Sequence, residues 1–553
     1  MGRKSIKKVF LGIFCISLLG LFSFSNPSER FFEIAKNLDI FATLFKEVNT
    51  YYVDDVNPNQ LISTGIEAML ASLDPYTNYI PEDAIEDFRT MTTGQYGGIG
   101  ALIGQRNGKN MVLMPYKGFP AQIGGLMIGD EILKIDGIDV KKKSTGDISK
   151  LLKGQANTDL NLTIKRYGQT DHFDLKLKRE KITIQNIPFH GMVTNNVGYV
   201  KLSDFTAGAS KEVKDALQDL KNKGAQKIIF DLRDNPGGLL SEAVNISNLF
   251  INKGSEVVST KGKMTDWNKS YKALNSPFDT DLPLVVLTSS RSASAAEIVA
   301  GVVQDYDRGV LVGQKSFGKG LVQATRPLTY NSQLKVTTAK YYTPSGRCIQ
   351  AIDYSHRNED GSVGKVPDSL KVAFKTKNGR IVYDGGGVDP DLAIEKKMFP
   401  PIAQSLGAKG LIFDYATEFR HKNTQIASPK DFKITDEEYN HFVKWLSNKD
   451  YDYVTKVEKT IEDLIENAKD EQFFEDIDKH IQSLKARVQH NKEHDLQIFK
   501  DDIKLLLKEE IISRYYYQQG IIEASFSHDE DVREALNVLN DTKRYEQILS
   551  STK

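Results

Sequence analysis

The sequence that decides the fold reads VGYVKLSDF (197–205), KEVKDALQDLKNKG (211–224) and QKIIFDLR (226–233). The outer two stretches are apolar and strand-like, whereas the middle one has the apolar spacing of an amphipathic helix. Helix-like and strand-like stretches continue to alternate in LLSEAVNISNLFI (239–251), PLVVLTSS (283–290), SAAEIVAGVVQDY (294–306) and RGVLVGQ (308–314). This alternation predicts an α/β fold with a largely parallel sheet.

The loops that follow the strands of such a sheet are the first candidates for function, because parallel sheets bind ligands at the carboxyl ends of their strands. Two of these loops stand out by composition, namely DNPGG (234–238) and SSRSAS (289–294).

Regions of different character flank the alternating pattern. Residues 30 to 90 have helical spacing of apolar residues. From about 96 to 180, short strand-like stretches are broken by turns at the Asn-Gly pair 107–108 and the Asp-Gly pair 136–137. Beyond about 400 the chain is charged and helical, which indicates solvated helices with an apolar face that packs on the body or on a partner.

Composition excludes several classes of protein. The 553 residues predict three or four domains of roughly 150 residues each. The 40% hydrophobic and 26% charged shares are ordinary for a soluble globular protein. Lys and Arg (73) balance Asp and Glu (73), which argues against nucleic-acid binding as the main task. The two cysteines, Cys15 and Cys348, are too few for a disulfide framework or a cysteine zinc module.

The first thirty residues combine a basic start, MGRKSIKK, with an apolar stretch that begins at Val9 and runs to about Phe24. This pattern is typical of an export signal, and the stretch is short for a spanning helix of about 20 residues. A cleaved signal peptide and an uncleaved membrane anchor both remain open for residues 1–25. Either predicts a location outside the cytoplasm.

Ser294 follows a buried-looking strand and opens a helix. Its simplest interpretation is a helix cap, which is a frequent role of serine. The same position also places the hydroxyl where backbone N–H groups and the helix dipole stabilise developing negative charge. Ser294 is therefore a candidate nucleophile as well as a candidate cap.

Lys319 lies in GQKSFGKG (313–320) between two glycines, and its simplest interpretation is a surface lysine on a turn. The segment matches the phosphate-loop pattern G-x-x-x-x-G-K, but Gly320 replaces the required Ser or Thr. The strand-like LVQATRPL also follows where a phosphate loop needs a helix. Nucleotide binding is therefore disfavoured.

A serine nucleophile needs a base, and the nine histidines lie outside the two strand-end loops. A neutral lysine can serve, provided that a dry and rigid pocket lowers its pKa from about 10.4 to about 7, at a cost of roughly 4.6 kcal/mol. Gln323 is placed to orient such an amine, and its alternative is an ordinary polar strand residue. Gly237 and Gly238 offer backbone N–H groups to an oxyanion, or form an ordinary turn. His490 and His494 have metal-ligand spacing without a third ligand nearby, so no metal is predicted.

Together these stretches resemble the carboxyl-terminal processing peptidases, or tail-specific proteases, of the S41 serine peptidase family. The matching stretches occur in family order: SLDPYTNYI (72–80), YGGIG (96–100), GGLMIGDEILKIDG (124–137), DLRDNPGG (231–238), SASAAEI (292–298), GQKSFGKG (313–320), YYTPSGR (341–347) and GGVDPD (386–391). The resemblance implies an α/β multidomain protein whose crotonase/ClpP-like core carries an inserted PDZ domain. The expected order is signal peptide or anchor, helical region, PDZ domain, peptidase core and charged helical region, at 1–25, 26–95, 96–180, 181–398 and 399–553.

The family's catalytic residues transfer by motif. The resemblance implies Ser294 as nucleophile, Lys319 as general base and Gln323 as the residue that orients the lysine. It implies an oxyanion hole from the backbone N–H groups of Gly237 or its neighbour and of Ala295. Two positions depart from the common pattern, Arg291 where many members have glycine and Ala296 where serine is frequent. Neither change removes a catalytic group.

The β-rich segment resembles a PDZ domain, with Tyr96, Gly97, Gly98 and Ile99 as its carboxylate-binding loop. Consecutive loop N–H groups can form a nest for a terminal carboxylate, and the adjacent strand edge can pair with a peptide. The resemblance implies an exported serine endopeptidase that holds the C-terminus of protein substrates and cleaves near it, in the periplasm or cell envelope. It implies no metal or organic cofactor, and the helical termini are a candidate homodimer interface.

Two other functions remain open from sequence. One is a catalytically inactive PDZ scaffold on a protease fold. The other is acyl-group chemistry on a coenzyme A thioester, because the family's core resembles the crotonase architecture.

Overall fold

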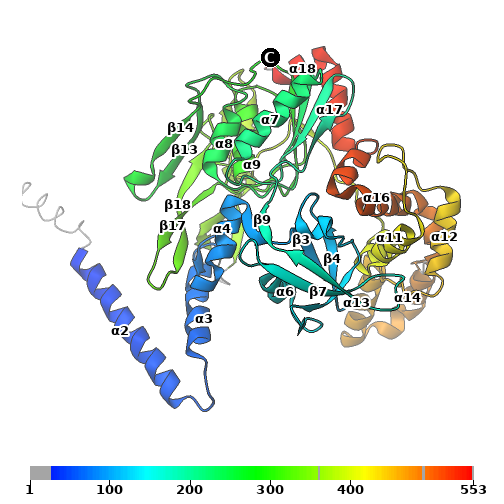
Figure 1. Ribbon diagram of the computed structural model, residues 1–553. Coiled ribbons are helices and arrows are strands. Elements are labelled where there is room, and N and C mark those ends of the chain that lie inside the picture. The colour runs from blue at the N-terminus through cyan, green and yellow to red at the C-terminus, as the bar shows by residue number, and fades with distance from the viewer. Residues whose placement is uncertain (1–26, 359–361, 489–491, 551–553) are drawn as a thin grey trace, which may run out of the picture. The chain divides into compact units, whose positions relative to one another are not determined.

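The computed structural model describes residues 27–358, 362–488 and 492–550 (Figure 1). The chain divides into two compact units after Tyr79. The predicted signal peptide or anchor at 1–25 lies outside the described residues. Within the described ranges, no helix combines the length and the apolar character needed to cross a membrane.

The first unit is helical, as the apolar spacing predicts. It contains α2 (Pro27–Tyr51) and α3 (Pro58–Ala71), and the short strand β1 (Asn78–Ile80) follows at the boundary between the units. Helix α3 begins where the side chain of Asn57 accepts hydrogen bonds from the N–H groups of Asn59 and Gln60. Proline at the first helical position fits this start, because its missing N–H would have no helical partner there.

The β-rich segment begins after α4 (Ile85–Thr93). Its elements are β2 (Gln95–Gly98), β3 (Ala101–Arg106), β4 (Lys109–Pro115), α5 (Pro120–Ile123), β5 (Glu131–Ile135), β6 (Ile138–Asp139), α6 (Thr145–Leu152), β7 (Asp159–Lys165), β8 (Phe173–Lys178) and β9 (Glu180–Thr183). An antiparallel sheet runs in the order β3-β4-β5-β7-β8. Both predicted turns are confirmed, at 107–108 and 136–137, where positive φ angles of 50° and 71° and of 48° and 81° suit tight hairpins.

The core from residue 189 to 393 is the predicted α/β layer structure. Its elements are β10 (Phe189–Met192), β11 (Val197–Lys201), α7 (Ala209–Asn222), β12 (Lys227–Asp231), α8 (Leu240–Ser247), β15 (Leu284–Thr288), α9 (Ala295–Asp305), β16 (Val310–Gly313) and β23 (Leu392–Ala393). The sheet has the order β10-β11-β12-β15-β16-β23, with β10 antiparallel and the other pairs parallel. The loops DNPGG and SSRSAS follow the neighbouring strands β12 and β15, so they meet at one edge.

A second sheet is antiparallel and carries the strand after Lys319. It contains β13 (Glu256–Gly262), β14 (Lys269–Lys272), β17 (Leu321–Pro327) and β18 (Gln333–Tyr342). Two hairpins follow, β19 (Ile352–Arg357) with β20 (Val363–Lys365) and β21 (Ala373–Lys375) with β22 (Ile381–Tyr383).

The charged C-terminal region is helical, as predicted. Its helices are α10 (Pro401–Ala408), α11 (Leu411–Lys422), α12 (Asp436–Leu446), α13 (Lys456–Asp470), α14 (Phe474–Val488), α15 (Lys492–Ile498), α16 (Lys500–Ser525), α17 (Glu530–Asn540) and α18 (Thr542–Leu549). Helix α16 is interrupted at Tyr517, whose φ of 57° and ψ of −156° are not helical.

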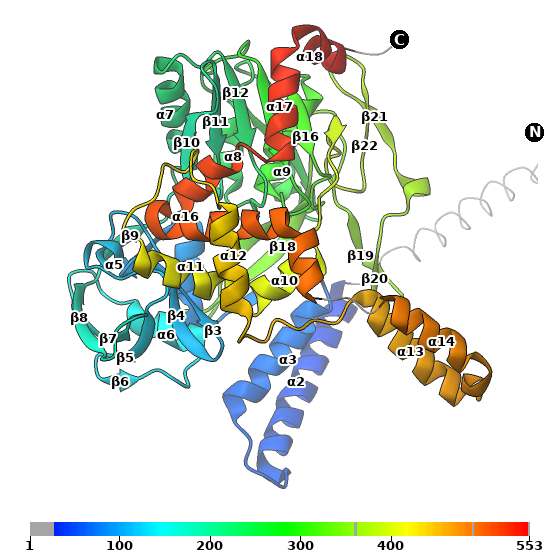
Figure 2. The same ribbon diagram turned by 90° about the vertical axis from the view of Figure 1, so that its right-hand side faces the viewer.

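The two faces of the core sheet are covered by helices from different parts of the chain. Helices α7, α8 and α9 bury their apolar side chains on one face. On the other face, Val532, Ala535, Val538 and Leu539 of α17 pack against alternate residues of the strands. Figure 2 shows α17 in front of this sheet. Because a parallel sheet needs cover on both faces, the C-terminal segment completes the α/β core.

Candidate active site

Ser294 lies at the turn from β15 into α9. Its φ of 55° and ψ of −112° place a non-glycine residue in a rarely adopted conformation. Such a backbone costs about 1–3 kcal/mol and persists only where the surroundings impose it, often at a functional site. The side chain is half-buried. A sharp strand-to-helix turn of this kind presents a serine hydroxyl at the end of a sheet.

The DNPGG turn lies directly against Ser294. Ser292 Oγ donates to the carbonyl of Leu232 at 2.8 Å, and Ala293 N–H donates to the carbonyl of Asn235 at 2.9 Å. Gly237 has a φ of 97°, and a Cβ at this position would come within 2.8 Å of the Ser294 Cβ. Only glycine fits so close to the serine, so the two loops form a single surface.

Glu297 holds the main chain around this surface. Its carboxylate is fully buried, and each oxygen accepts two hydrogen bonds. The Oε2 atom accepts from the backbone N–H of Ser294 at 2.8 Å and of Lys319 at 2.9 Å. The Oε1 atom accepts from Ser316 Oγ at 2.6 Å and from Gly318 N–H at 2.7 Å. The predicted nucleophile and the predicted base are thus tied to the same oxygen atom.

No cation supplies these four hydrogen bonds. Burial raises the pKa of Glu297, and the donated hydrogen bonds oppose this rise because they favour the ionised carboxylate. The sequence analysis missed Glu297, although Ser294 to Glu297 matches the capping-box spacing S-x-x-E, in which the glutamate accepts from the N-cap backbone N–H.

Lys319 and Gln323 lie on either side of the start of β17. Lys319 is half-buried and precedes the strand by two residues. Gln323 lies where the pairing of β17 with β18 shifts register, and its Nε2 donates to Thr337 Oγ1 at 3.2 Å. The structure therefore joins the main chains of Ser294 and Lys319 through Glu297 and places Gln323 on the adjoining strand. The catalytic roles of the three side chains stay predictions.

The backbone donors differ in their availability. The N–H of Gly237, expected in the oxyanion hole, donates to Asn235 Oδ1 at 2.8 Å in this structure. Among the residues that the structure describes, no acceptor pairs with the N–H groups of Gly238 and Ala295. The N–H of Gly238, the neighbour of Gly237, is therefore the better candidate for the oxyanion hole, together with that of Ala295.

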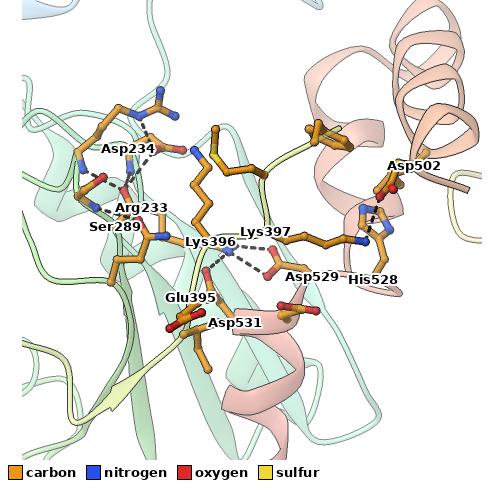
Figure 3. A pocket seen from close by; sticks show the side chains of 18 of the residues that line it. Arg233, Asp234, Ser289, Glu395, Lys396, Lys397, Asp502, His528, Asp529 and Asp531 are labelled. Atoms are coloured by element: carbon orange, nitrogen blue, oxygen red, sulfur yellow. Dashed lines mark hydrogen bonds and ion pairs between the residues drawn. The ribbon is translucent and has the colours of Figure 1, made fainter. Parts of the chain in front are cut away.

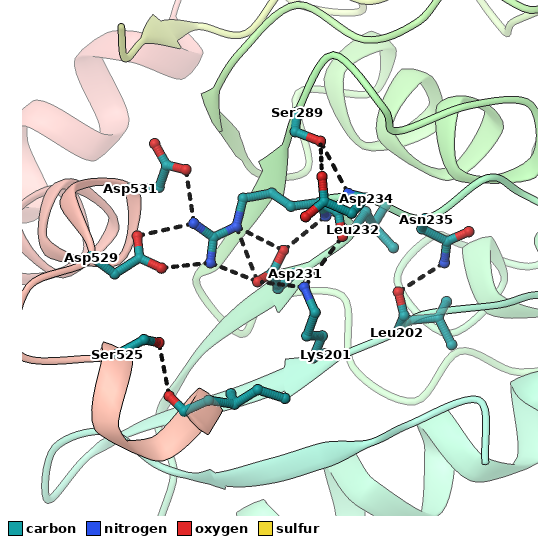
Figure 4. Close-up of polar contacts among 12 residues, drawn as sticks. Lys201, Leu202, Asp231, Leu232, Asp234, Asn235, Ser289, Ser525, Asp529 and Asp531 are labelled. Carbon is teal, nitrogen blue, oxygen red and sulfur yellow. Dashed lines mark hydrogen bonds and ion pairs between the residues drawn. The ribbon is translucent and has the colours of Figure 1, made fainter. Parts of the chain in front are cut away.

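A second buried carboxylate, Asp231, lies at the end of β12 and was not singled out from sequence. Its side chain accepts from Tyr199 Oη. It also accepts from Lys201 Nζ at 3.3 Å and from Arg233, whose Nη2 lies 2.7 Å from Oδ2. Figure 4 shows Lys201 and Asp231 in this cluster. Burial opposes its ionisation, but Arg233 and Lys201 together hold the pKa of Asp231 below its ordinary value. Arg233 immediately precedes the DNPGG turn, so this cluster fixes where the turn begins.

A cavity of about 570 Å³ opens beside this cluster (Figure 3). It is lined from the core by Lys201, Arg233, Asp234 and Arg291, and from the C-terminal region by Asp502 and His528, among others. Asp234 forms an ion pair with the exposed Arg291 at 2.8 Å. Ser294 does not line this cavity.

The β-rich segment has its own groove, a cavity of about 250 Å³ between β3 and α6. It is lined by Tyr96, Gly98, Ile99, Ala101, Leu102, Ile103, Thr145, Ser149, Leu152 and Lys153. Three of the four predicted loop residues therefore face the groove, and Gly97 does not. The main chain from 95 to 98 forms β2 and pairs with β9. Lys153 donates to Asp87 at 2.6 Å and lies 5.6 Å above the Tyr96 ring.

No metal centre emerges from the described residues, which contain no cluster of three or more His, Cys, Asp or Glu side chains able to hold an ion. His490 of the pair with metal-ligand spacing lies outside the described residues, and His494 is exposed.

Comparisons with known proteins identify the family and the domains of the chain. Family models for peptidase family S41, for a PDZ domain and for "Probable PDZ-protease, C-terminal helical domain" match residues 196–355, 111–166 and 402–539. A carboxy-terminal-processing protease of Bartonella bacilliformis is 35% identical over 348 residues, which cover 62% of this chain and 79% of that protein. The chain belongs to peptidase family S41.

Two further proteins match similar shares of this S41 peptidase. A "Probable CtpA-like serine protease" of Staphylococcus aureus is 37% identical over 57% of this chain and 62% of its own. A solved photosystem II D1 C-terminal processing protease is 26% identical, covers 65% of this chain and 93% of its own, and has a TM-score of 0.35. The predicted serine peptidase class and the predicted α/β multidomain fold with a PDZ domain are confirmed.

Proposed function

We propose that this S41 peptidase cleaves proteins with Ser294 as nucleophile and Lys319 as general base. The observation that supports this proposal is the shared acceptor, Glu297 Oε2, which binds the backbone N–H groups of both residues. One buried carboxylate thus holds the main chains of the serine and the lysine close together. Gln323 lies on the adjoining strand, and because its Nε2 donates to Thr337, its Oε1 is the atom that would accept from the lysine amine.

The reaction follows from these positions. Neutral Lys319 takes the hydroxyl proton while Ser294 Oγ attacks the scissile carbonyl carbon. The backbone N–H groups of Ala295 and of Gly238 or Gly237 stabilise the oxyanion of the tetrahedral intermediate. The protonated lysine then donates its proton to the leaving amine. Water hydrolyses the acyl-enzyme with the lysine again acting as base.

The proposal is tested with Ser294→Ala and Lys319→Ala in a casein or quenched-peptide cleavage assay. Each variant should lower kcat by at least about 10³-fold, because removing a member of a nucleophile-base pair costs most of the catalysis. Matched controls are Ser290→Ala and Lys315→Ala, which change exposed or half-exposed residues of the same two loops. Cleavage by Ser294→Ala at the wild-type rate would reject the dyad. If the wild-type protein binds peptides but does not cleave them, an inactive scaffold is favoured.

The groove between β3 and α6 is proposed to hold the C-terminus of the substrate. It combines a glycine-rich loop at Gly98 and Ile99 with an apolar wall from Leu102, Ile103 and Leu152. A free carboxylate suits the loop N–H groups, an apolar terminal side chain suits the wall, and β3 can pair with the peptide backbone.

Peptides that differ only at their last carboxyl test this role. A substrate with a free C-terminus should have at least a tenfold lower KM than its C-terminal amide, since the amide removes the charge that the loop binds. Ser149→Tyr, which fills the groove, should abolish this difference, whereas Lys150→Tyr on the exposed side of α6 should preserve it. Equal KM values for acid and amide would show that substrates enter by another route.

The cell envelope is the proposed location, with the basic and apolar start of the chain acting as a signal peptide or an anchor. Fractionation of cells and N-terminal sequencing of the mature protein test both versions. A start near residue 26 in the soluble envelope fraction indicates cleavage, and an intact N-terminus in the membrane fraction indicates an anchor. Recovery only from the cytoplasm would reject export.

A further inference from the structure

The guanidinium of Arg233 is held from two sides by parts of the chain almost 300 residues apart. On the core side it donates to Asp231, with Nε 3.0 Å from Oδ1 and Nη2 2.7 Å from Oδ2. On the other side the C-terminal region supplies two more carboxylates. Arg233 Nη1 lies 2.9 Å from Asp529 Oδ1 and 2.8 Å from Asp531 Oδ2, and Nη2 lies 2.8 Å from Asp529 Oδ2 (Figure 4).

We infer that Asp529 and Asp531, at the start of α17, are positioning residues of the peptidase reaction. They act through Arg233 to fix the DNPGG turn against Ser294. This inference rests on the proposed Ser294–Lys319 function and adds to it a contribution from the C-terminal helical region. The two residues touch neither the nucleophile nor the base.

The path from Arg233 to the reacting centre is short and continuous. Arg233 directly precedes the turn, and its carbonyl accepts from Lys201 Nζ at 3.2 Å. The next residue, Asp234, donates its N–H to Ser289 Oγ at 3.0 Å, which joins the turn to the loop that carries Ser294. Three residues further on, Gly237 lies so close to Ser294 that a Cβ on the glycine would come within 2.8 Å of the serine Cβ. A rotation of Arg233 would therefore shift the N–H groups proposed for the oxyanion.

Helix α17 is a firm support for this contact. Its buried face packs on the core sheet, so its position does not depend on the ion pairs. Asp529 is also the N-cap of the helix and accepts the N–H of Val532 at 3.1 Å. The side chains of Arg233, Asp529 and Asp531 are between 15% and 19% exposed, so solvent screens them little. Five donors of a planar guanidinium are matched by carboxylates in fixed directions, which is a device for orientation.

A purely structural role for these ion pairs is the alternative, and the variants are chosen to separate the two. Asp529→Ser keeps an N-cap but is too short for the guanidinium, and Asp531→Asn removes the second charge. Glu530→Gln is the matched control, because Glu530 lies between them in the same first turn, is exposed and pairs with Arg533 rather than Arg233. All variants are made in the full-length chain, and kcat and KM are measured where circular dichroism shows them folded.

Each single variant should lower kcat about tenfold and the double variant about 100-fold, with KM changed less than twofold, since small misplacements of a catalytic group have effects of this size. Glu530→Gln should match wild type. Lysine lacks the planar guanidinium that binds both carboxylates. When Asp529 and Asp531 are both changed in an Arg233→Lys background, kcat should therefore fall less than threefold further.

Several results would overturn the inference. A double variant with wild-type kcat shows that the core alone positions the turn. Activity that falls only in proportion to the folded fraction shows a structural role. The same conclusion follows if the double variant lowers kcat as much in the Arg233→Lys background as it does in the wild-type background. Ser294→Ala is assayed in parallel, because wild-type cleavage by that variant rejects the proposed function, whereas an inactive Ser294→Ala with a fully active double variant rejects only the role of α17.

Discussion

Two carboxylates flank the candidate active site, and both are completely buried, yet among the residues that the structure describes charged side chains bind only one of them. Glu297 accepts four hydrogen bonds from a serine hydroxyl and three backbone N–H groups. Asp231 lies between Arg233 and Lys201 and also accepts from Tyr199. Burial raises the pKa of Glu297, whereas the two cations hold the pKa of Asp231 below its ordinary value.

The difference shows what each group contributes. A carboxylate bound by main-chain donors fixes the path of the chain, because N–H groups point in directions that the backbone sets. A carboxylate bound by long cationic side chains fixes the position of those side chains, and here it fixes the Arg233 guanidinium. Glu297 therefore determines where the main chains of Ser294 and Lys319 lie. Asp231 determines where Arg233 lies, directly before the DNPGG turn.

The largest effect is expected from Glu297→Gln. Glutamine has one acceptor oxygen instead of two, and its NH₂ group would face donors, so about two buried N–H or O–H groups lose their partner. We expect kcat to fall by about 10³-fold and the free energy of unfolding by about 2–5 kcal/mol. Cleavage assays and urea denaturation measure the two quantities.

Glu212→Gln is the matched control for this prediction. Glu212 lies on α7 and also accepts from backbone N–H groups, those of Asn186 and Ile187, and neither donor belongs to the two loops. It should lose stability while kcat stays within threefold of wild type. If Glu297→Gln loses stability but keeps its kcat, the carboxylate does not position the catalytic pair.

The next prediction concerns Asp231→Asn, for which we expect the main effect on stability rather than on kcat. Removing one partner of a buried ion pair leaves an uncompensated charge and costs about 3–5 kcal/mol. Because the folded-state pKa of Asp231 is lowered, its contribution is present above the ordinary value of 3.8 and is lost as pH falls through the lower folded value. Urea denaturation should therefore show a steeper loss of stability below about pH 4 in the wild type than in the variant.

Asp215→Asn, which breaks an exposed pair with Lys211, serves as control and should cost less than about 1 kcal/mol. Parallel pH profiles for wild type and Asp231→Asn would mean that the ionisation of Asp231 is not coupled to folding, and the contrast with Glu297 would be lost.

Much of this arrangement is predictable from sequence, since the alternating pattern from 197 to 314 indicates the sheet and the strand-end rule selects its two loops. Glu297 was missed because an acidic residue in the first turn of a helix has a routine explanation, as a partner of the helix dipole or of the cap. Its contacts with Gly318 and Lys319 come from a loop that sequence spacing does not place.

The sequence did not predict, for a different reason, that α17 covers the second face of the core sheet. The spacing of Val532, Ala535 and Leu539 predicts an amphipathic helix, but periodicity does not say which surface covers its apolar face. The intervening helices from α10 to α16 suggest a separate region, so the packing of α17 on β12, β15 and β16 follows only from the fold. Arg233 gains its outer partners through the same packing.

The smallest effect is expected from a third carboxylate, Asp204. Glu297 and Asp231 suggest that burial raises the pKa of a carboxyl group unless cationic side chains oppose it, and Asp204 tests this rule. It is partly buried beside a cavity of about 240 Å³ that is lined by Tyr116 and Lys117 of the PDZ segment and by Tyr517 of α16. Burial raises the pKa of Asp204 to about 6. The native state therefore holds a proton that the unfolded chain has released, and the free energy of unfolding falls as pH rises from about 4 to about 6.

Asp204→Asn mimics the protonated form at every pH. It should stabilise the protein by about 1–2 kcal/mol at pH 7, after allowance for the partial exposure of the side chain, and leave stability unchanged at pH 3.5. Urea denaturation between pH 3.5 and 7.5 measures this difference, with the exposed Asp281→Asn as control. A destabilised Asp204→Asn at pH 7 would mean that the ionised carboxylate is favoured by a partner, as Asp231 is, and that burial alone does not set the pKa at the junction of the PDZ segment, the core and α16.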